Sequence, residues 1–217
     1  MPSPSLPLFL VMIIKICGLQ TTEYACVAAE AGADMIGLVF APSRRQVSVV
    51  AAAAISAAVR SLPTPHPQIV GLFVNTSVTE INAVADEVGL DLVQLSGDES
   101  LTDVVGMSRQ IIKSIRMDAS QREADWIGAG VRLLVDAHVP GAYGGTGTRA
   151  DWQHAAELAR RVPLILAGGL DPTNVAEAIA HVRPQGVDVS SGVETGGVKS
   201  ATKIRAFIAA ARGTTGV

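Results

Sequence analysis

The sequence has few aromatic residues, few charged residues and only two cysteines. Phe, Trp and Tyr make up 4% of its 217 residues, too few for the stacking surfaces that bind single-stranded nucleic acid. Its net charge of −3 argues further against binding to a nucleic acid backbone. Two cysteines cannot form a disulfide framework and fit a reducing, cytoplasmic compartment. With 48% hydrophobic residues, the chain has enough apolar surface to fold, which excludes intrinsic disorder.

Residues 1–11 form an apolar segment with two early prolines. The segment is far shorter than the ~20 residues of a membrane helix, and no Lys or Arg precedes its apolar run as in a secretion signal. We interpret 1–11 as a disordered tail or a misplaced translation start, because Met12 opens directly onto a predicted strand. Residues 12–217 are then expected to form one domain without membrane association.

Short apolar runs rich in Val, Ile and Leu recur along the chain and alternate with segments of helical character. Runs of this kind, bounded by turn residues, are typical of strands that a parallel sheet buries on both faces. They lie at 12–16, 35–40, 69–74, 91–95, 110–115, 131–136, 163–167 and 186–190. Helices, several with Ser, Thr or Gly at their predicted ends, are expected at 21–31, 49–60, 77–88, 101–108, 120–128, 151–161, 173–181 and 201–211.

Eight strand–helix units in succession predict an α/β fold with a parallel sheet, either a closed (β/α)8 TIM barrel or an open, doubly wound sheet. An open sheet usually has its glycine-rich phosphate turn after the first strand, where this chain has only Cys17-Gly18-Leu19. The glycine-rich turns instead follow the seventh and eighth strands, where barrels bind phosphate. The sequence therefore favours a single TIM barrel.

The two late turns predict an anion site. Gly168 and Gly169 follow the seventh strand, and Ser190, Ser191 and Gly192 follow the eighth. Backbone amides of these turns, and of the helix start after the seventh strand, can bind a phosphate without any Lys or Arg. Glycines that merely form tight turns are the alternative.

Other candidate residues lie where strands end, which is the active-site end of a barrel. Cys17 is either a small buried hydrophobe or, close to the helix start at Thr21, a thiol with a lowered pKa. Asp136 is either a loop cap or a functional carboxylate, since an unused charge there would be costly. Arg45 is either a surface charge or a clamp for a carboxylate. The histidines lack the spacing of metal ligands, so we expect no metal site.

Gly145, Thr146 and Gly147 belong to a glycine-rich stretch that fits the dinucleotide pattern G-x-G-x-x-A. The stretch does not directly follow a strand, and no acidic residue stands at a strand end about twenty residues later. We therefore interpret it as a mobile loop over the pocket.

These motifs, in their order and spacing, resemble the phosphoribosylanthranilate isomerase family of tryptophan biosynthesis, whose fold is the (β/α)8 barrel. The resemblance extends from about Met12 to Phe207. It rests on KICGL at 15–19, GLVF at 37–40, SRRQV at 43–47, VGLFVN at 70–75, VQLSG at 93–97, LVDA at 134–137, GGTG at 144–147, LAGGL at 166–170 and VDVSSGVE at 187–194.

The resemblance implies an aldose–ketose isomerase that rearranges N-(5-phosphoribosyl)anthranilate without a cofactor. It implies Cys17 as general base, Asp136 as general acid, Arg45 as ligand of the anthranilate carboxylate and Asp188 as a residue near the substrate. The chain departs from the family in Ser96, where the family usually has His. Alternatives are another phosphosugar barrel, either the histidine-pathway isomerase, with Asp in place of the catalytic Cys, or indole-glycerol phosphate synthase, with catalytic Lys and Glu at strand ends, and a non-enzymatic phosphate-binding module. We expect a monomer, with a homodimer as the alternative.

Overall fold

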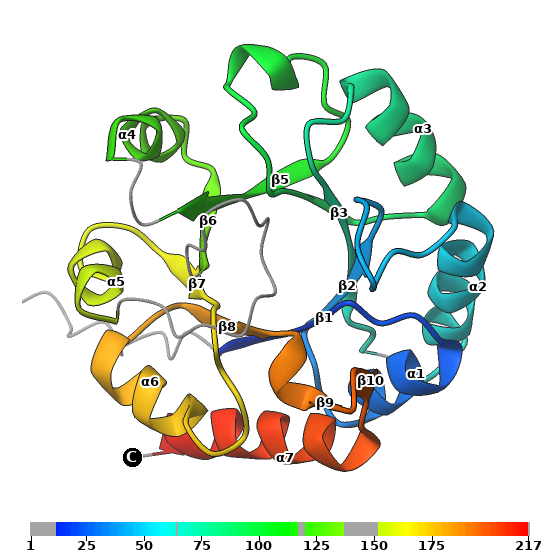
Figure 1. The fold of residues 1–217 in the computed structure, drawn as a ribbon, viewed down its shortest axis with the longest axis vertical. Coiled ribbons are helices and arrows are strands. Elements are labelled where there is room, and N and C mark those ends of the chain that lie inside the picture. The colour runs from blue at the N-terminus through cyan, green and yellow to red at the C-terminus, as the bar shows by residue number, and fades with distance from the viewer. Residues whose placement is uncertain (1–11, 64, 117–119, 137–151, 217) are drawn as a thin grey trace, which may run out of the picture.

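Eight parallel strands close into a barrel in this computed structural model (Figure 1). The structure describes residues 12–63, 65–116, 120–136 and 152–216. Each strand pairs with the next in sequence, and the eighth pairs with the first, which confirms the predicted TIM barrel. The strands are β1 (Ile13–Cys17), β2 (Met35–Val39), β3 (Gln68–Phe73), β4 (Leu92–Leu95), β5 (Gln110–Arg116), β6 (Arg132–Asp136), β7 (Leu164–Leu166) and β8 (Gly186–Val189).

The α-helices cover the outside of the barrel (Figure 1). They are α1 (Thr22–Glu30), α2 (Val49–Arg60), α3 (Val78–Val88), α4 (Ser120–Gly128), α5 (Trp152–Ala159), α6 (Val175–Val182) and α7 (Ala201–Arg212). Several predicted caps are present: the Thr21 hydroxyl accepts the Tyr24 N–H, and Gly89, with φ of 72°, ends α3. Within the described ranges, no helix has both the length and the apolar character needed to span a membrane.

The predicted helix at 101–108 is wrong. The connection between β4 and β5 contains only a short 3-10 turn, η1 (Thr102–Val104). Leu101 provides no side-chain cap, and Gly106 has φ of 89°, which is incompatible with a continuing helix. The side chain of Asn82 on α3 binds the segment instead: its Nδ2 donates to the Gly106 carbonyl at 2.9 Å, and its Oδ1 accepts the Ser108 N–H at 3.0 Å.

Two interior layers of the barrel set the depth of the site. Because successive side chains of a strand point to opposite faces, one residue in two fills the barrel. One interior cluster is apolar and consists of Met35, Val70, Leu92, Ile112, Leu134, Ile165 and Ala167. Closer to the C-terminal strand ends, Cys17 clusters with Val39 and Ala41. The apolar cluster closes the barrel interior below the site, and the layer that contains Cys17, nearer the strand ends, can provide reactive side chains.

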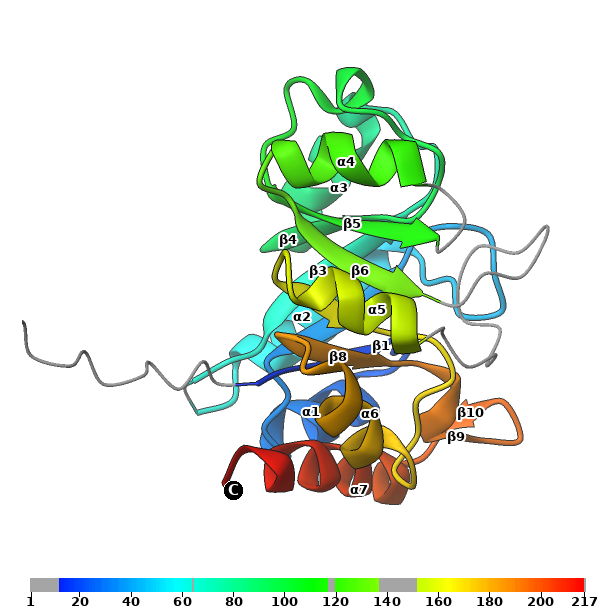
Figure 2. The same cartoon turned by 90° about the vertical axis from the view of Figure 1, so that its left-hand side faces the viewer.

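A small hairpin of β9 (Glu194–Thr195) and β10 (Val198–Lys199) follows β8 and the 3-10 turn η2 (Ser191–Val193). Figure 2 shows this hairpin at the end of the barrel toward which the arrows of β5 and β6 point. The segments 1–11 and 137–151 lie outside the described residues, so the interpretations of the N-terminal segment and of Gly145, Thr146 and Gly147 stay predictions.

Candidate active site

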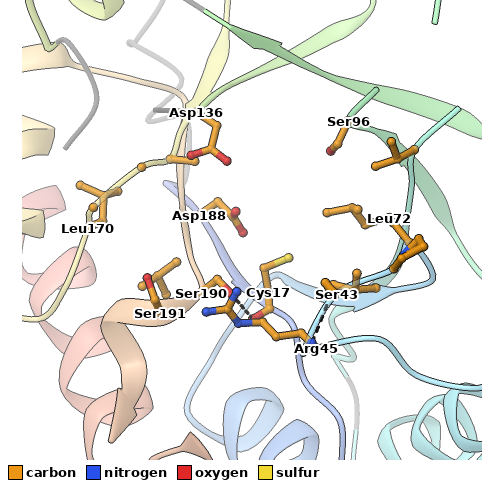
Figure 3. A pocket seen from close by; sticks show the side chains of 18 residues that line it. Cys17, Ser43, Arg45, Leu72, Ser96, Asp136, Leu170, Asp188, Ser190 and Ser191 are labelled. Carbon is orange, nitrogen blue, oxygen red and sulfur yellow. Dashed lines mark hydrogen bonds between the residues drawn. The ribbon is translucent and has the colours of Figure 1, made fainter. Parts of the chain in front are cut away.

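A cavity of about 400 Å³ opens at the C-terminal ends of the strands (Figure 3). Most of the candidate residues line it: Cys17, Arg45, Asp136, Gly168, Gly169, Asp188, Ser190 and Ser191. The side chains of Val39, Leu72, Val74 and Leu170 supply apolar surface to the same cavity. A ligand with both apolar and polar groups would find matching surface here.

Cys17 ends β1 and points into the barrel, where its side chain is buried. Burial raises the pKa of its thiol, while the positive charges of Lys15 and Lys199 act in the opposite direction. The expected lowering by the start of α1 is therefore wrong for this structure. The reason is geometric, because α1 lies outside the barrel and the thiol faces the interior, where desolvation dominates.

Lys15 and Asp188 form an ion pair below Cys17. They are partners in the register between β1 and β8, and Lys15 Nζ donates to Asp188 Oδ1 at 2.8 Å. The Lys15 side chain is fully buried. Burial alone would lower the pKa of Lys15, but the charges of Asp188 and Cys17 outweigh this effect and raise it. Lys15 is thus charged deep inside the barrel, and Asp188 carries the matching carboxylate into the cavity.

A second charged cluster surrounds Glu194, which follows the turn after β8. Its carboxylate accepts Arg45 Nε at 2.7 Å, Arg44 Nη2 at 2.6 Å and Lys199 Nζ at 3.1 Å. Burial would raise the pKa of Glu194, but hydrogen bonds and charges from Arg45 and Lys199 lower it to about 2. Three cations therefore share one carboxylate, which leaves positive charge in excess at this rim of the cavity.

The cluster changes two expectations from the sequence. Arg45 directs Nε and Nη2 to Glu194, so this edge of its guanidinium is occupied. The phosphate turn is not free of basic side chains either, because Lys199 Nζ donates to the Ser190 carbonyl at 2.8 Å. The phosphate turn, predicted to bind through the backbone amides of glycine and serine residues, therefore also contains the ammonium group of Lys199.

The segment just before α6 contributes less to the cradle than predicted. The carboxylate of Asp171 accepts the backbone N–H groups of Thr173 at 2.7 Å and Asn174 at 3.2 Å. These two amides, which precede α6, are engaged within the chain; the expectation of free N–H groups in the first turn of the helix itself stays a prediction. The 3-10 turn η2 after β8 offers the more direct N-terminal amides, since Ser190 and Ser191 at its start line the cavity.

Glycine is needed at the two turns for different structural reasons. Gly168 and Gly169 have φ of 89° and 65°, a left-handed conformation that favours glycine. Gly192 does not line the cavity. A Cβ at Gly192 would collide with the backbone carbonyl oxygen of Leu170, so this glycine lets the β8 turn approach the β7 turn. Its predicted contact with phosphate stays a prediction.

Sequence reasoning did not single out Lys15 and Lys199, and it treated Glu194 only as part of a phosphate turn. The signal for Lys15 is its position in an otherwise apolar strand. Ser96, the departure from the family pattern, lines the cavity, and its hydroxyl accepts Gln94 Nε2 at 3.1 Å. Among the residues that the structure describes, no three His, Cys, Asp or Glu side chains are grouped to hold a metal ion.

Comparisons with known proteins find relatives along nearly the whole chain. Residues 14–210 match the family described as N-(5'phosphoribosyl)anthranilate (PRA) isomerase. A relative from Roseiflexus sp. (strain RS-1), named N-(5'-phosphoribosyl)anthranilate isomerase, is 57% identical over 206 residues, which cover 92% of this chain and 97% of that protein.

Solved structures are similar over the whole barrel. Phosphoribosyl anthranilate isomerase from Thermotoga maritima is 36% identical, with a TM-score of 0.81 over 93% of this chain and 99% of that chain. A phosphoribosyl anthranilate isomerase in complex with reduced 1-(o-carboxyphenylamino)-1-deoxyribulose 5-phosphate is 35% identical, with a TM-score of 0.79 over the same shares. Because sequence and fold both match along nearly the entire chain, the protein belongs to the N-(5'-phosphoribosyl)anthranilate isomerase family.

Proposed function

We propose that the chain converts N-(5-phosphoribosyl)anthranilate to 1-(2-carboxyphenylamino)-1-deoxyribulose 5-phosphate, with Cys17 as general base and Asp136 as general acid. Membership of the family makes the chain an aldose–ketose isomerase of tryptophan biosynthesis. The observation that carries the residue assignment is that a thiol and a carboxyl group, from strands on different sides of the barrel, open into one cavity.

The reaction needs one acid and one base on a bound ribose. Asp136, protonated at the start, gives its proton to the furanose oxygen, the bond from this oxygen to C1 breaks, and the nitrogen lone pair forms a Schiff base. The Cys17 thiolate then removes the proton from C2, and the C–H electrons form the enolamine. Tautomerisation moves the enol proton to C1 and gives the ketone. A proton returned through solvent from Cys17 to Asp136 resets the site.

The charges around the cavity support binding of both anionic ends of this substrate. The excess positive charge of Arg44, Arg45 and Lys199 over Glu194 suits a phosphate or a carboxylate. We assign the turns at Gly168–Gly169 and Ser190–Ser191 to the phosphate and Arg45 to the anthranilate carboxylate. Val39, Leu72 and Val74 provide apolar surface for the aromatic ring. Anchors of this kind hold the ribose against the two proton-transfer groups.

Two single substitutions test the assignment. Cys17→Ser and Asp136→Asn should each lower kcat by at least ~100-fold with little change in KM, because each removes a proton-transfer group but no binding contact. The assay follows the fluorescence of the anthranilate-linked substrate, and the histidine-pathway aminoaldose is run in parallel to test the rival barrel activity. Cys26→Ser, which alters the other free cysteine on α1, is the matched control and should keep the parental kcat. Turnover of Asp136→Asn at the parental rate would refute the acid assignment.

A further inference from the structure

Lys15 is a buried cation that the proposed proton transfers do not use. Its side chain has no exposed surface, and it forms an ion pair with Asp188 at 2.8 Å. Enclosing an ammonium group in a barrel is costly even when it is paired, because both charges lose their hydration. A neutral pair of apolar side chains would fill the same space at lower cost, so the charge itself needs an explanation.

Lys15 and Cys17 direct their side chains to the same point. The two residues are separated by one position on β1, so both face the barrel interior. A Cβ added to Gly37, the neighbour of Cys17 on β2, would lie 2.8 Å from Cys17 Sγ and 3.2 Å from Lys15 Nζ. The missing side chain of Gly37 therefore leaves one position on β2 that both the ammonium and the thiol approach closely.

We infer that Lys15 is a positioning residue for the general base: its ammonium is shared between the Asp188 carboxylate and the Cys17 thiolate, and it gives the buried thiol a larger thiolate fraction than it would have without this cation. The inference rests on the proposed role of Cys17. This role explains why position 15 has a charged side chain and not an apolar one, because a thiolate in a desolvated site is stabilised by a positive charge close to it.

Several other charges act on Cys17 and set the balance. They are Asp188 on β8 and Lys199 on β10; Asp136 on β6 and Arg45 after β2 line the same cavity as Cys17. Burial and the Asp188 carboxylate favour the neutral thiol, whereas Lys15 and, more weakly, Lys199 favour the thiolate. Arg45 and Lys199 are both held by Glu194. Lys15 is therefore the main group that opposes burial at the thiol.

The two members of the ion pair should act on Cys17 in opposite directions. Lys15→Met removes the stabilising cation and leaves the Asp188 charge facing the thiol, so the titration midpoint of Cys17 should rise by at least about one pH unit, a tenfold loss of thiolate below the midpoint. Asp188→Asn removes the repelling anion, so the midpoint should fall. If the pair only held the barrel together, breaking it from either side would have effects of the same kind.

The experiment measures Cys17 in the unliganded protein. All variants carry Cys26→Ser, so that a single thiol remains. The rate of alkylation by iodoacetamide is followed by mass spectrometry as a function of pH, and thiolate absorbance in the ultraviolet gives a second readout that does not depend on reagent access. Lys113→Met is the matched control, because Lys113 is also buried and ion-paired, with Glu99 at 2.6 Å, but packs on Trp126 instead of Cys17. It should leave the midpoint unchanged.

Opposite shifts in Lys15→Met and Asp188→Asn support the inference. An unchanged midpoint in Lys15→Met, or shifts of the same sign in both variants, overturns it. If Lys15→Met does not fold, the double variant Lys15→Met/Asp188→Asn is compared with Asp188→Asn alone: a higher midpoint in the double variant supports the inference, and an equal midpoint overturns it. The titration needs no substrate, so its outcome is separate from the test of Cys17 as base, which is the kcat of Cys17→Ser.

Discussion

Glu194 is the residue whose charge contributes most clearly to both stability and the site. Its carboxylate holds Arg44, Arg45 and Lys199 together, and its side chain is almost fully buried. Glu194→Gln keeps the shape of the side chain but removes the negative charge. The substitution therefore leaves three neighbouring cations, two of them buried, without their shared counterion.

The size of the effect follows from the pKa of Glu194. Folding lowers this pKa from 4.5 to about 2, and each pKa unit corresponds to about 1.4 kcal/mol. The ionised carboxylate thus contributes about 3 kcal/mol to the free energy of unfolding near neutral pH. This agrees with the range of about 3–5 kcal/mol for removing one partner from a buried ion pair.

The sign of the pH dependence follows from the direction of the shift. A carboxyl group whose pKa is lowered by folding stabilises the protein fully above its unfolded pKa, here 4.5. The contribution disappears as the pH falls toward the folded pKa of about 2. Other carboxylates titrate in this window too, but they do so equally in parent and variant. The stability difference between the two proteins should therefore shrink on acidification.

Urea unfolding followed by tryptophan fluorescence measures the difference directly. We expect Glu194→Gln to be less stable than the parent by about 3 kcal/mol near neutral pH and by less than half of this at about pH 3. Glu157→Gln, a substitution at an exposed position of α5, is the matched control and should stay within about 0.5 kcal/mol of the parent. A deficit below about 1 kcal/mol near neutral pH, or one that is equal at both pH values, would refute the electrostatic reasoning.

Three further substitutions probe the rim of the cavity. Arg45→Ala should mainly raise KM, by roughly tenfold or more at nearly constant kcat, in steady-state assays, because it removes a binding charge and no proton-transfer group. Lys199→Met should weaken competitive inhibition by inorganic phosphate roughly tenfold, since it removes one charge-assisted contact of the Ser190 turn; inhibition at the parental level would contradict this role. Gly192→Ala should cost about 1–3 kcal/mol in urea unfolding, because its Cβ would meet the rigid Leu170 backbone, while Gly213→Ala, where a Cβ meets nothing, should cost almost none.

Local sequence patterns predict most of the barrel for physical reasons that act over a few residues. Buried parallel strands need continuous apolar runs, and helix starts need a side-chain acceptor such as Thr21 or Ser77. The segment at 101–108 escapes these rules because its backbone is held by Asn82, a residue of another helix. No local pattern contains such a long-range hydrogen bond.

The meeting of Cys17, Asp136 and the two late turns in one cavity is also predictable, because parallel strands in a barrel end on the same side. The ion pairs formed by Lys15, Asp188 and Glu194 around this cavity cannot be predicted from local sequence patterns. Glu194 contacts Arg44 and Arg45 across about 150 positions of the chain, and this contact exists only because β8 closes onto β1. The pKa of Cys17 depends in the same way on the closed barrel, which buries the thiol and brings Asp188 close to it; both effects raise this pKa, so the lowering inferred from the nearby helix start is wrong.

The Lys15–Asp188 pair and the cluster around Glu194 differ in net charge, and this difference indicates a different role for each. Lys15 and Asp188 cancel, so their pair can remain in the barrel interior without a ligand. Arg44, Arg45 and Lys199 exceed Glu194 in charge, and the repulsion among them weakens the unliganded protein. A bound phosphate or carboxylate would relieve this repulsion, so the excess charge represents stability given up for anion binding. The same physics explains why a protein with a net charge of −3 can hold a substrate with two anionic groups: Arg44, Arg45 and Lys199 gather around the single carboxylate of Glu194.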